Sequence, residues 1–220
     1  MDRDEIFRLV KKAPVLYKDK EIINICRDKK VLDVGCAGQD FSVDDPAWMH
    51  GQISKVAREL IGVDINIPKI QMINEKGFKV LTPEKLSESG SLFDIVTMAD
   101  VIEHVNDPVT FLSFYSGFLK EGGRIVITTP NAHGIRNFTS IIIRNNYSVN
   151  PEHTFWFCPK TMLEVAERAG LRFSEFCWLN EYFTIKDMPG LKNRSIFLFN
   201  RMMKRLRSNF SPNFMIILEK

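Results

Sequence analysis

The sequence predicts an α/β protein built on a mostly parallel sheet. Short runs of β-branched residues alternate with longer amphipathic segments along most of the chain, and glycine or proline separates many of them. Alternation of this kind is typical of β-α-β units, in which a helical crossover joins two parallel strands. The chain has 220 residues, of which 45% are hydrophobic and 26% are charged, and this size and composition fit a soluble globular protein with a well-buried core.

The individual elements follow from periodicity and from their end signals. Runs rich in β-branched residues predict strands at 30–34, 61–64, 78–81, 93–98, 124–128, 171–179 and 214–218. Amphipathic segments predict helices at 4–12, 19–27, 52–60, 68–75, 108–119 and 159–169. The last two helices each begin with proline and are closely followed by glycine, which are common start and end signals of a helix.

The overall charge and the cysteines argue against several classes of protein. The formal net charge is +3, which is too small to predict nucleic-acid binding by itself. The four cysteines stand far apart without a Cys-x-x-Cys pair, so we expect free thiols in a reducing cytoplasm rather than a zinc site or a redox motif. No run approaches the roughly 18 apolar residues of a membrane span, and the first residues lack the apolar core of a secretory signal.

One segment departs from the alternation of strands and helices. We expect a single domain, 1–220, with an N-terminal helical segment at 1–28 and a basic insertion at 180–212 before the last strand. Residues 188–218 contain six basic residues and no acidic one. On a helix, four apolar residues of this segment would share one face: Ile196, Phe199, Met203 and Leu206. Residues 192–207 could therefore contact an anionic membrane surface or an acidic partner, or form a helix packed on the domain with its charges in solvent.

The sharpest signal is a strand that runs into a turn of small residues, Val31–Gly38, with the sequence Val-Leu-Asp-Val-Gly-Cys-Ala-Gly. Glycine in such a turn lets a ligand approach the backbone closely. The next predicted strand ends at Asp64, and an acid in that place can bind both hydroxyls of a ribose. Parallel sheets carry their ligands at the carboxyl ends of strands, so these two features predict a cofactor that contains a nucleoside.

The residues of the turn discriminate between nucleoside cofactors. A dinucleotide site needs Gly-x-Gly-x-x-Gly to bring a pyrophosphate onto a helix N-terminus, but Ala37 and Asp40 occupy the second and third glycine positions. Asp33 and Asp40 would also repel a pyrophosphate, whereas an acid at Asp33 suits a cofactor with an amino group. The turn therefore favours S-adenosylmethionine over NAD.

Five motifs in order extend this signal along the chain: Val31–Gly38, Gly62–Asp64, Phe93–Val105, Leu119–Asn131 and Glu152–Phe157, the last leading into the helix at 159–169. Together they resemble the class I S-adenosylmethionine-dependent methyltransferases, and most closely the branch that includes the ubiquinone-type O-methyltransferases. The resemblance covers about residues 28–179. It implies a Rossmann-like, doubly wound, mostly parallel seven-stranded sheet with helices on both faces and a C-terminal antiparallel strand.

The resemblance also assigns contacts with S-adenosylmethionine, residue by residue. It implies that the methionine part is received by Asp33 and by the turn residues Gly35, Cys36, Ala37 and Gly38. Asp64 is implied to bind the ribose hydroxyls, and Ile65 to lie against the adenine. Two further residues at the end of the fourth predicted strand are implied to line the cofactor: Met98 and Ala99.

Two features depart from the family pattern. The acid that usually follows the third strand is missing, so Thr82 or Glu84 would have to fix the adenine, or no residue does so. The stretch between the glycine turn and Asp64 is longer than usual. Its extra residues, 39–52, could shape a substrate pocket, order on binding as a lid, or fill the core.

Catalysis of methyl transfer requires that the acceptor be positioned against the methyl group and that a base remove a proton from the acceptor. Histidine has the side-chain pKa that best suits this base. Of the four histidines, His104 and His153 are the predicted catalytic residues, and His50 and His133 are weaker candidates. Glu103 is expected near the mouth of the site, although it could equally face solvent. No metal is predicted.

The acceptor is predicted to be a hydroxyl of a small molecule or of a glycan- or lipid-linked intermediate. The Pro-Pro-aromatic signature of enzymes that methylate amines of nucleic-acid bases is absent, so no nucleic-acid partner is expected. Two alternatives stay open: a non-catalytic S-adenosylmethionine-binding module that regulates a partner, and an NAD-dependent reductase. The sequence does not indicate the oligomeric state.

Overall fold

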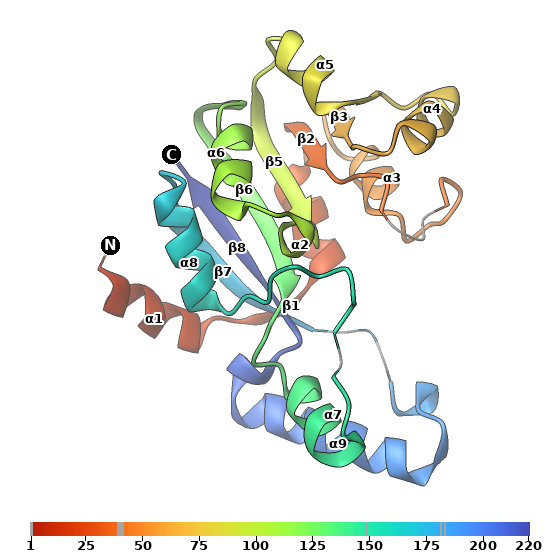
Figure 1. The fold of residues 1–220 in the computed structure, drawn as a ribbon, viewed down its shortest axis with the longest axis vertical. Coiled ribbons are helices and arrows are strands. Elements are labelled where there is room, and N and C mark those ends of the chain that lie inside the picture. Colours follow the sequence, from red (N-terminus) through yellow and green to blue (C-terminus); the bar gives the residue numbers. More distant parts are fainter. Residues whose placement is uncertain (1, 39–41, 148, 181, 183) are drawn as a thin grey trace.

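The computed structural model describes residues 2–38, 42–147, 149–180, 182 and 184–220, and within them eight strands form one sheet (Figure 1). The strand order is β1-β7-β8-β6-β5-β2-β3-β4. Strand β8 runs antiparallel to both of its neighbours, and the other neighbouring strands are parallel. The strands are β1 (Val15–Tyr17), β2 (Lys30–Val34), β3 (Glu59–Val63), β4 (Val80–Leu81), β5 (Phe93–Ala99), β6 (Leu119–Pro130), β7 (Arg172–Asn180) and β8 (Asn213–Glu219).

Helices cover both faces of this sheet (Figure 1). One face packs against α1, α6 and α8, and the other packs against α2 and α3. Leu32 and Val34 point to the first face and Val31 to the second, as the twofold periodicity of a strand requires. The helices are α1 (Arg3–Lys12), α2 (Lys18–Cys26), α3 (Met49–Ile53), α4 (Ile67–Glu75), α5 (Pro83–Glu88), α6 (Pro108–Ser116), α7 (Ile135–Arg144), α8 (Pro159–Arg168) and α9 (Gly190–Leu206).

Local side-chain chemistry explains where several helices begin. Asn66 caps α4 by accepting a hydrogen bond from the Lys69 amide at 3.1 Å, and Asp107 caps α6 by accepting one from the Thr110 amide at 3.0 Å. Proline occupies the first turn of both helices, where its missing N–H costs nothing. The predicted helices at 68–75 and 108–119 are therefore confirmed, although α6 ends at Ser116.

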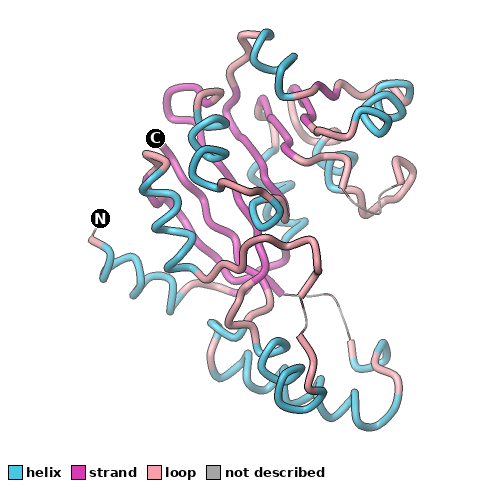
Figure 2. Tube along the Cα trace, viewed as in Figure 1, coloured by secondary structure: helices cyan, strands magenta, loops and turns pink. Residues whose placement is uncertain are grey.

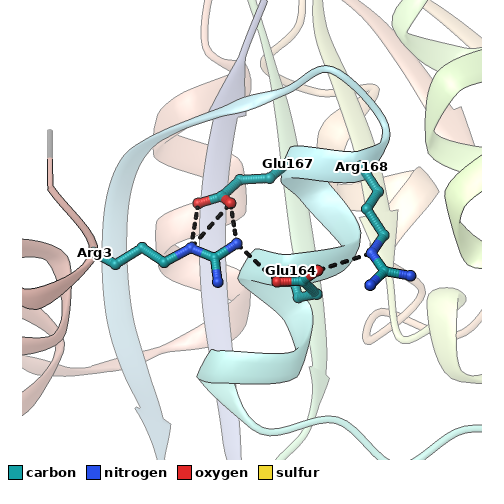
Figure 3. Close-up of polar contacts among 4 residues, drawn as sticks. All are labelled: Arg3, Glu164, Glu167 and Arg168. Atoms are coloured by element: carbon teal, nitrogen blue, oxygen red, sulfur yellow. Dashed lines mark hydrogen bonds and ion pairs between the residues drawn. The ribbon is translucent and has the colours of Figure 1, made fainter.

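The N-terminal helix α1 is attached to α8 by charge and to the sheet by apolar contact. Figure 3 shows Arg3 of α1 between Glu164 and Glu167 of α8; its guanidinium lies 2.7 Å from a carboxylate oxygen of Glu164. Exposed ion pairs of this kind contribute at most about 1 kcal/mol. The burial of Ile6 and Val10 in the core is therefore the stronger attachment.

The prediction of a mostly parallel sheet with an antiparallel C-terminal strand is confirmed, but the number of strands is eight rather than seven. The additional strand β1 pairs with β7 in parallel. It was missed because three residues between Pro14 and Lys18 carry no visible alternation. The helix predicted at 52–60 is wrong: α3 ends at Ile53, and the Arg58 amide donates to the Lys29 carbonyl at 2.9 Å, which starts the pairing of β3 with β2.

Two helices form a unit beyond the carboxyl ends of the strands (Figure 2). Helix α7, which the sequence did not predict, follows the end of β6, and α9 forms most of the basic insertion. The Asn200 amide donates to the Thr139 hydroxyl at 3.3 Å, and Arg144 donates to the Asn193 amide oxygen at 2.8 Å. These contacts join α7 to α9. Among the described residues, no helix is both long enough and apolar enough to cross a bilayer.

The strand order reverses at β2, which has β3 on one side and β5 on the other. In open parallel sheets the crevice at this point, at the carboxyl ends of the strands, is the usual ligand site. The loops after β2, β3 and β5 meet there.

Candidate active site

The turn after β2 has a backbone shape that demands glycine. Gly35 has a φ of +72°, and its amide donates to the Val63 carbonyl of β3 at 2.8 Å. A Cβ atom at this position would lie 2.6 Å from Cγ2 of Val101. Any side chain at Gly35 would therefore displace the β5 loop as well as strain the turn. The structure places Gly35, Cys36 and Gly38 on the wall of a cavity of about 270 Å³.

Asp64 follows β3 and lies beside this turn. One carboxylate oxygen accepts the Ala37 amide at 3.0 Å, and the other accepts the Asn66 amide at 2.9 Å. Each oxygen keeps a further lone pair, so the carboxylate can still accept two hydroxyl groups. Ile65 comes next and is 84% exposed, leaving a large apolar side chain open to a flat ring. The placement that the resemblance implies for Asp64 and Ile65 is thus available, whereas Ala37 is buried and its contact with the cofactor stays a prediction.

Asp33 lines the same cavity, although its side chain is almost fully buried. It is buried, and its two carboxylate oxygens lie 2.9 Å from Nδ1 of His50 and 2.7 Å from the hydroxyl of Thr97. The expectation that Asp33 receives the amino group of the cofactor stays a prediction, since its nearest partners are protein groups. His50 is buried in this contact and also lines the cavity, and its role as a base stays a prediction.

Only the end of the described part of the long loop packs as core: Trp48 and His50 are buried, whereas Ser42 and residues 44–47 are exposed. The Trp48 indole donates to the Cys36 carbonyl at 2.8 Å, and its ring stands edge-on to Phe78. Residues 39–41 of this loop lie outside the described residues. Among the interpretations of residues 39–52, the contact of Trp48 with Cys36 favours a segment that packs against the glycine turn. Ala47 and Met49 of this segment also line the cavity.

At the end of β5, Ala99 lines the cavity as expected. The side chain of Met98 is fully buried in the core, and the contact of Met98 with the cofactor stays a prediction.

Lys18 and Asp100 form an ion pair that sequence reasoning missed. Lys18 begins α2 and lines the cavity, and its ammonium lies 2.5 Å from a carboxylate oxygen of Asp100. Burial alone would lower the pKa of Lys18, but Asp100 raises it above its usual value. Asp100 has a φ of +57° and accepts the Thr128 hydroxyl at 2.8 Å. No sequence pattern links these residues, because α2 reaches β5 only through the folded sheet.

Glu103, His104 and His153 come together just beyond β5. The two histidine rings meet edge to face with centroids 4.6 Å apart. The Thr154 and Phe155 amides donate to the Glu103 carbonyl at 2.9 and 3.1 Å, which fastens the loop of His153 to the short helix Ile102–His104. The structure thus brings together the two histidines that the sequence singled out, whereas His133 is exposed elsewhere.

Glu103 is buried rather than facing solvent, so that alternative is wrong. The Thr129 hydroxyl donates to one carboxyl oxygen at 3.0 Å, and the other oxygen has no partner within the described part of the chain. Burial raises the pKa of Glu103 to about 8, and the charge of Asp100 adds to this effect. Burial and the neighbouring His104 lower the pKa of His153, whose Nδ1 is also without a described partner.

The same three side chains have the geometry of a cation site. Their ligand atoms all lie within 4.8 Å of one another, which is close enough to hold one metal ion. Carboxylate and imidazole are common metal ligands. The prediction that no metal binds here stays a prediction.

The residues at this edge fit S-adenosylmethionine. Gly35 and Gly38 lie on the cavity wall, Asp64 can accept ribose hydroxyls, and Ile65 offers an apolar surface for the adenine. Lys18 supplies a cation on the cavity wall for a carboxylate. A switch point with this turn and this acid defines the class I S-adenosylmethionine-dependent methyltransferases.

The chain belongs to the family described as "Methyltransferase domain", whose model matches residues 5–175. The ubiquinone biosynthesis O-methyltransferase of Cereibacter sphaeroides is 27% identical over 171 residues, covering 68% of this chain and 66% of that protein. The protein of the same name from Coxiella burnetii is 29% identical over 186 residues, covering 79% of this chain and 76% of that protein. The chain therefore spans just under two thirds of the first relative and about three quarters of the second.

Solved structures show the same fold. The crystal structure of a SAM dependent methyltransferase from Archaeoglobus fulgidus matches with a TM-score of 0.58 at 22% identity and covers 100% of both chains. The methyl donor that the family implies is S-adenosylmethionine.

Replacing Gly35 tests whether the close contact between the turn and Val101 requires glycine. We expect Gly35→Ala to reduce the free energy of unfolding by about 1–3 kcal/mol more than Gly77→Ala, and to weaken S-adenosylhomocysteine binding. Both glycines have positive φ, but nothing lies within 4 Å of a Cβ at Gly77, so this control isolates the clash with Val101. Urea unfolding and calorimetry measure the two effects, and equal effects of both changes would contradict the assignment.

The raised pKa of Glu103 predicts a specific dependence of stability on pH. The folded protein holds this proton up to about pH 8, whereas the unfolded chain releases it near pH 4.3. Glu103 therefore contributes stability that is fully present below the unfolded pKa and is lost as the pH rises through about 8. The free energy of unfolding of the wild type relative to Glu103→Gln should fall by up to about 1.4 kcal/mol per pH unit.

Urea unfolding with EDTA present, between about pH 5 and pH 8, provides this comparison. EDTA prevents a bound cation from holding the carboxylate ionised. A difference that is constant with pH would show that Glu103 ionises at its ordinary pKa, and one that rises with pH would show a pKa below it; either result contradicts the prediction.

Proposed function

We propose that this protein transfers the methyl group of S-adenosylmethionine to a hydroxyl of a small molecule or of a glycan- or lipid-linked intermediate. The observation that carries the proposal is the placement of Asp64 and of the His104–His153 pair on opposite sides of the glycine turn. Strand β2, which leads into the turn, has β3 with Asp64 on one side and β5 with the histidines beyond it on the other. The names of the curated relatives support a hydroxyl as the acceptor.

The chain's own residues would hold the cofactor at this edge. When bound, S-adenosylmethionine supplies an electrophilic methyl group on a sulfonium. Asp64 binds the ribose hydroxyls with the lone pairs that the Ala37 and Asn66 amides leave free. Lys18 attracts the carboxylate of the methionine part, and Asp100 keeps the Lys18 side chain in place.

The histidine pair supplies the base. The lowered pKa of His153 keeps its ring neutral near pH 7, so the ring can accept the proton of the acceptor hydroxyl. His104 orients that ring by its edge-to-face contact. Glu103, protonated at neutral pH, adds no negative charge beside the cofactor. A base in this role typically contributes about 10²–10⁴-fold to the rate.

Calorimetry and a turnover assay test this function together. We expect wild-type protein to bind S-adenosylhomocysteine, and Asp64→Ala to bind it at least about tenfold more weakly because charge-assisted hydrogen bonds to the ribose are lost. With a responsive hydroxyl acceptor, His104→Gln and His153→Gln should lower kcat by about 10²–10⁴-fold without changing cofactor affinity. His133→Gln is the matched control and should keep full activity.

Two other results would replace the proposal. Tight S-adenosylhomocysteine binding with no turnover on any pool of hydroxylated small molecules, glycans or lipid extracts would indicate a regulatory module. A thermal shift with NADH and none with S-adenosylhomocysteine would indicate a reductase. A specific ligand at 100 times its dissociation constant stabilises a protein by about 2.7 kcal/mol, which a thermal shift detects easily.

We place this activity in the cytoplasm, at an anionic membrane surface. All four cysteines are free, which supports a reducing compartment. Leu191, Leu198 and Met202 lie on one side of α9 at intervals of whole turns, and each is at least half exposed, Leu191 by 83%. Residues 188–218 carry no acidic residue that anionic lipids would repel. An exposed apolar stripe on a basic helix is typical of helices that lie in a membrane interface.

Flotation with vesicles tests the membrane contact. Wild-type protein should bind phosphatidylcholine vesicles that contain phosphatidylglycerol, and high salt should weaken the binding. Leu191→Ser with Leu198→Ser should reduce binding about tenfold or more, since less apolar area enters the bilayer. The matched control changes two leucines of similar exposure far from α9, Leu9→Ser with Leu92→Ser. An equal loss in the control, or no binding at all, would favour an acidic protein partner or a solvated helix.

A further inference from the structure

A second cavity lies at the same edge of the sheet as the cofactor site. It has a volume of about 1390 Å³ and is bounded by the ends of β1 and β7 and by α7 and α9. Tyr17 lines this cavity, and the next residue, Lys18, lines the cofactor cavity. The two cavities are therefore neighbours along the carboxyl edge, and one molecule could extend from one into the other.

The wall of this second cavity is strongly cationic. Its basic residues are Lys11, Arg136, Arg144, Arg201, Lys204, Arg205 and Arg207. Among the described residues that line it, Asp187 is the only acid, and its carboxylate already accepts hydrogen bonds from the amide and the hydroxyl of Thr184 at 2.6 and 2.9 Å. We call this space the cationic cavity.

Several of these cations have no acidic partner. No carboxylate of the residues that the structure describes pairs with Arg144, Arg201 or Arg205, and Arg144 instead donates to the neutral amide of Asn193. Like charges gathered on one wall repel one another, and an anion between them would relieve this repulsion. Most of the basic residues are arginines, whose planar guanidinium groups can donate two parallel hydrogen bonds to the oxygens of one phosphate.

A buried polar group in the wall gives a second indication of a ligand. Asn200 is only 9% exposed, lines the cationic cavity, and donates through its amide nitrogen to Thr139. Its amide oxygen has no partner in the described structure. An unsatisfied buried acceptor is unfavourable, and a ligand hydroxyl that donates to it would remove this cost. The side of α9 that carries Asn200 is opposite the exposed stripe of Leu191 and Leu198, so Asn200 itself faces away from the proposed membrane contact.

We propose that the cationic cavity binds the phosphate- or diphosphate-bearing part of the acceptor, with a neighbouring hydroxyl on Asn200, and that the acceptor is therefore a phosphorylated polyol such as a glycosyl phosphate. The proposal rests on the proposed function, since it assigns the acceptor of that same edge. The phosphate lies in the cationic cavity, and the hydroxyl to be methylated extends past Tyr17 toward Lys18 and the histidine pair.

Calorimetry with two soluble probes tests the site without knowledge of the acceptor. Inorganic diphosphate and glucose 1-phosphate should bind the full-length protein, and the affinity should fall as salt rises. Arg201→Gln with Arg205→Gln should weaken binding of both probes by about tenfold or more, because each arginine donates charge-assisted hydrogen bonds. Circular dichroism should show that this variant is folded, since both side chains are exposed.

The matched control removes the same charge from the same helix. Lys192 and Arg194 lie on α9 but do not line the cationic cavity, so Lys192→Gln with Arg194→Gln should change the affinity by less than about twofold. An equal loss in both double variants would show that the probes respond only to net charge and would overturn the site. Absence of binding by either probe at millimolar concentration would overturn it as well.

Vesicles separate the two sources of phosphate. Phosphatidylcholine vesicles with phosphatidic acid should bind more weakly to the Arg201→Gln, Arg205→Gln variant if the cavity takes a lipid headgroup, and free glucose 1-phosphate should then compete. Equal vesicle binding by that variant and the wild type, with loss of soluble probe binding, would identify a soluble phosphate ester instead.

S-adenosylhomocysteine binding, measured on the same samples, distinguishes failure of the proposed methyl transfer from failure of the cationic cavity as a phosphate site. Neither double variant should alter it, because none of the four residues lines the cofactor cavity. Diphosphate binding without S-adenosylhomocysteine binding would refute the proposed function and leave an anion site. The opposite result would refute the cationic cavity alone.

Discussion

The buried carboxylate of Asp33 holds the cofactor edge together. It joins β2 to the Thr97 hydroxyl of β5 and to the His50 ring that follows the long loop. A carboxylate in the interior must be paired or hydrogen-bonded, because its desolvation otherwise outweighs any packing gain. The turn of Gly35 follows directly after β2, and this turn, Asp33 and Lys18 all line the same cavity.

The parts of the site that could be predicted are those encoded within one stretch of sequence. The strand that enters the glycine turn, the acid at Asp64 and the approach of His104 to the end of β5 are local features, and the structure has them where the pattern placed them. The burial of Glu103 and the pairing of Lys18 with Asp100 depend on elements that are remote in sequence. Periodicity cannot reveal such contacts, since it reports only which residues share a face.

Helix α9 is a second case in which the sequence pattern did not reveal which side of an element meets the rest of the protein. The apolar face proposed from the sequence contains Ile196 and Met203, which are half-buried, but also Phe199 and Leu206, which are exposed. The helix instead has a polar side with Asn200 toward the cationic cavity and a separate apolar stripe toward solvent. A pattern of charged and apolar residues does not say which side meets protein until α7, itself unpredicted, is in place.

The two outermost strands are the shortest in the described sheet. Strand β1 has three residues and β4 has two. The rim of a sheet exposes unpaired amides and carbonyls onto which a foreign strand can add, and such addition is the common route to aggregation. Strands this short give an incoming strand few hydrogen bonds, so β1 and β4 disfavour the addition of a foreign strand at their own edges.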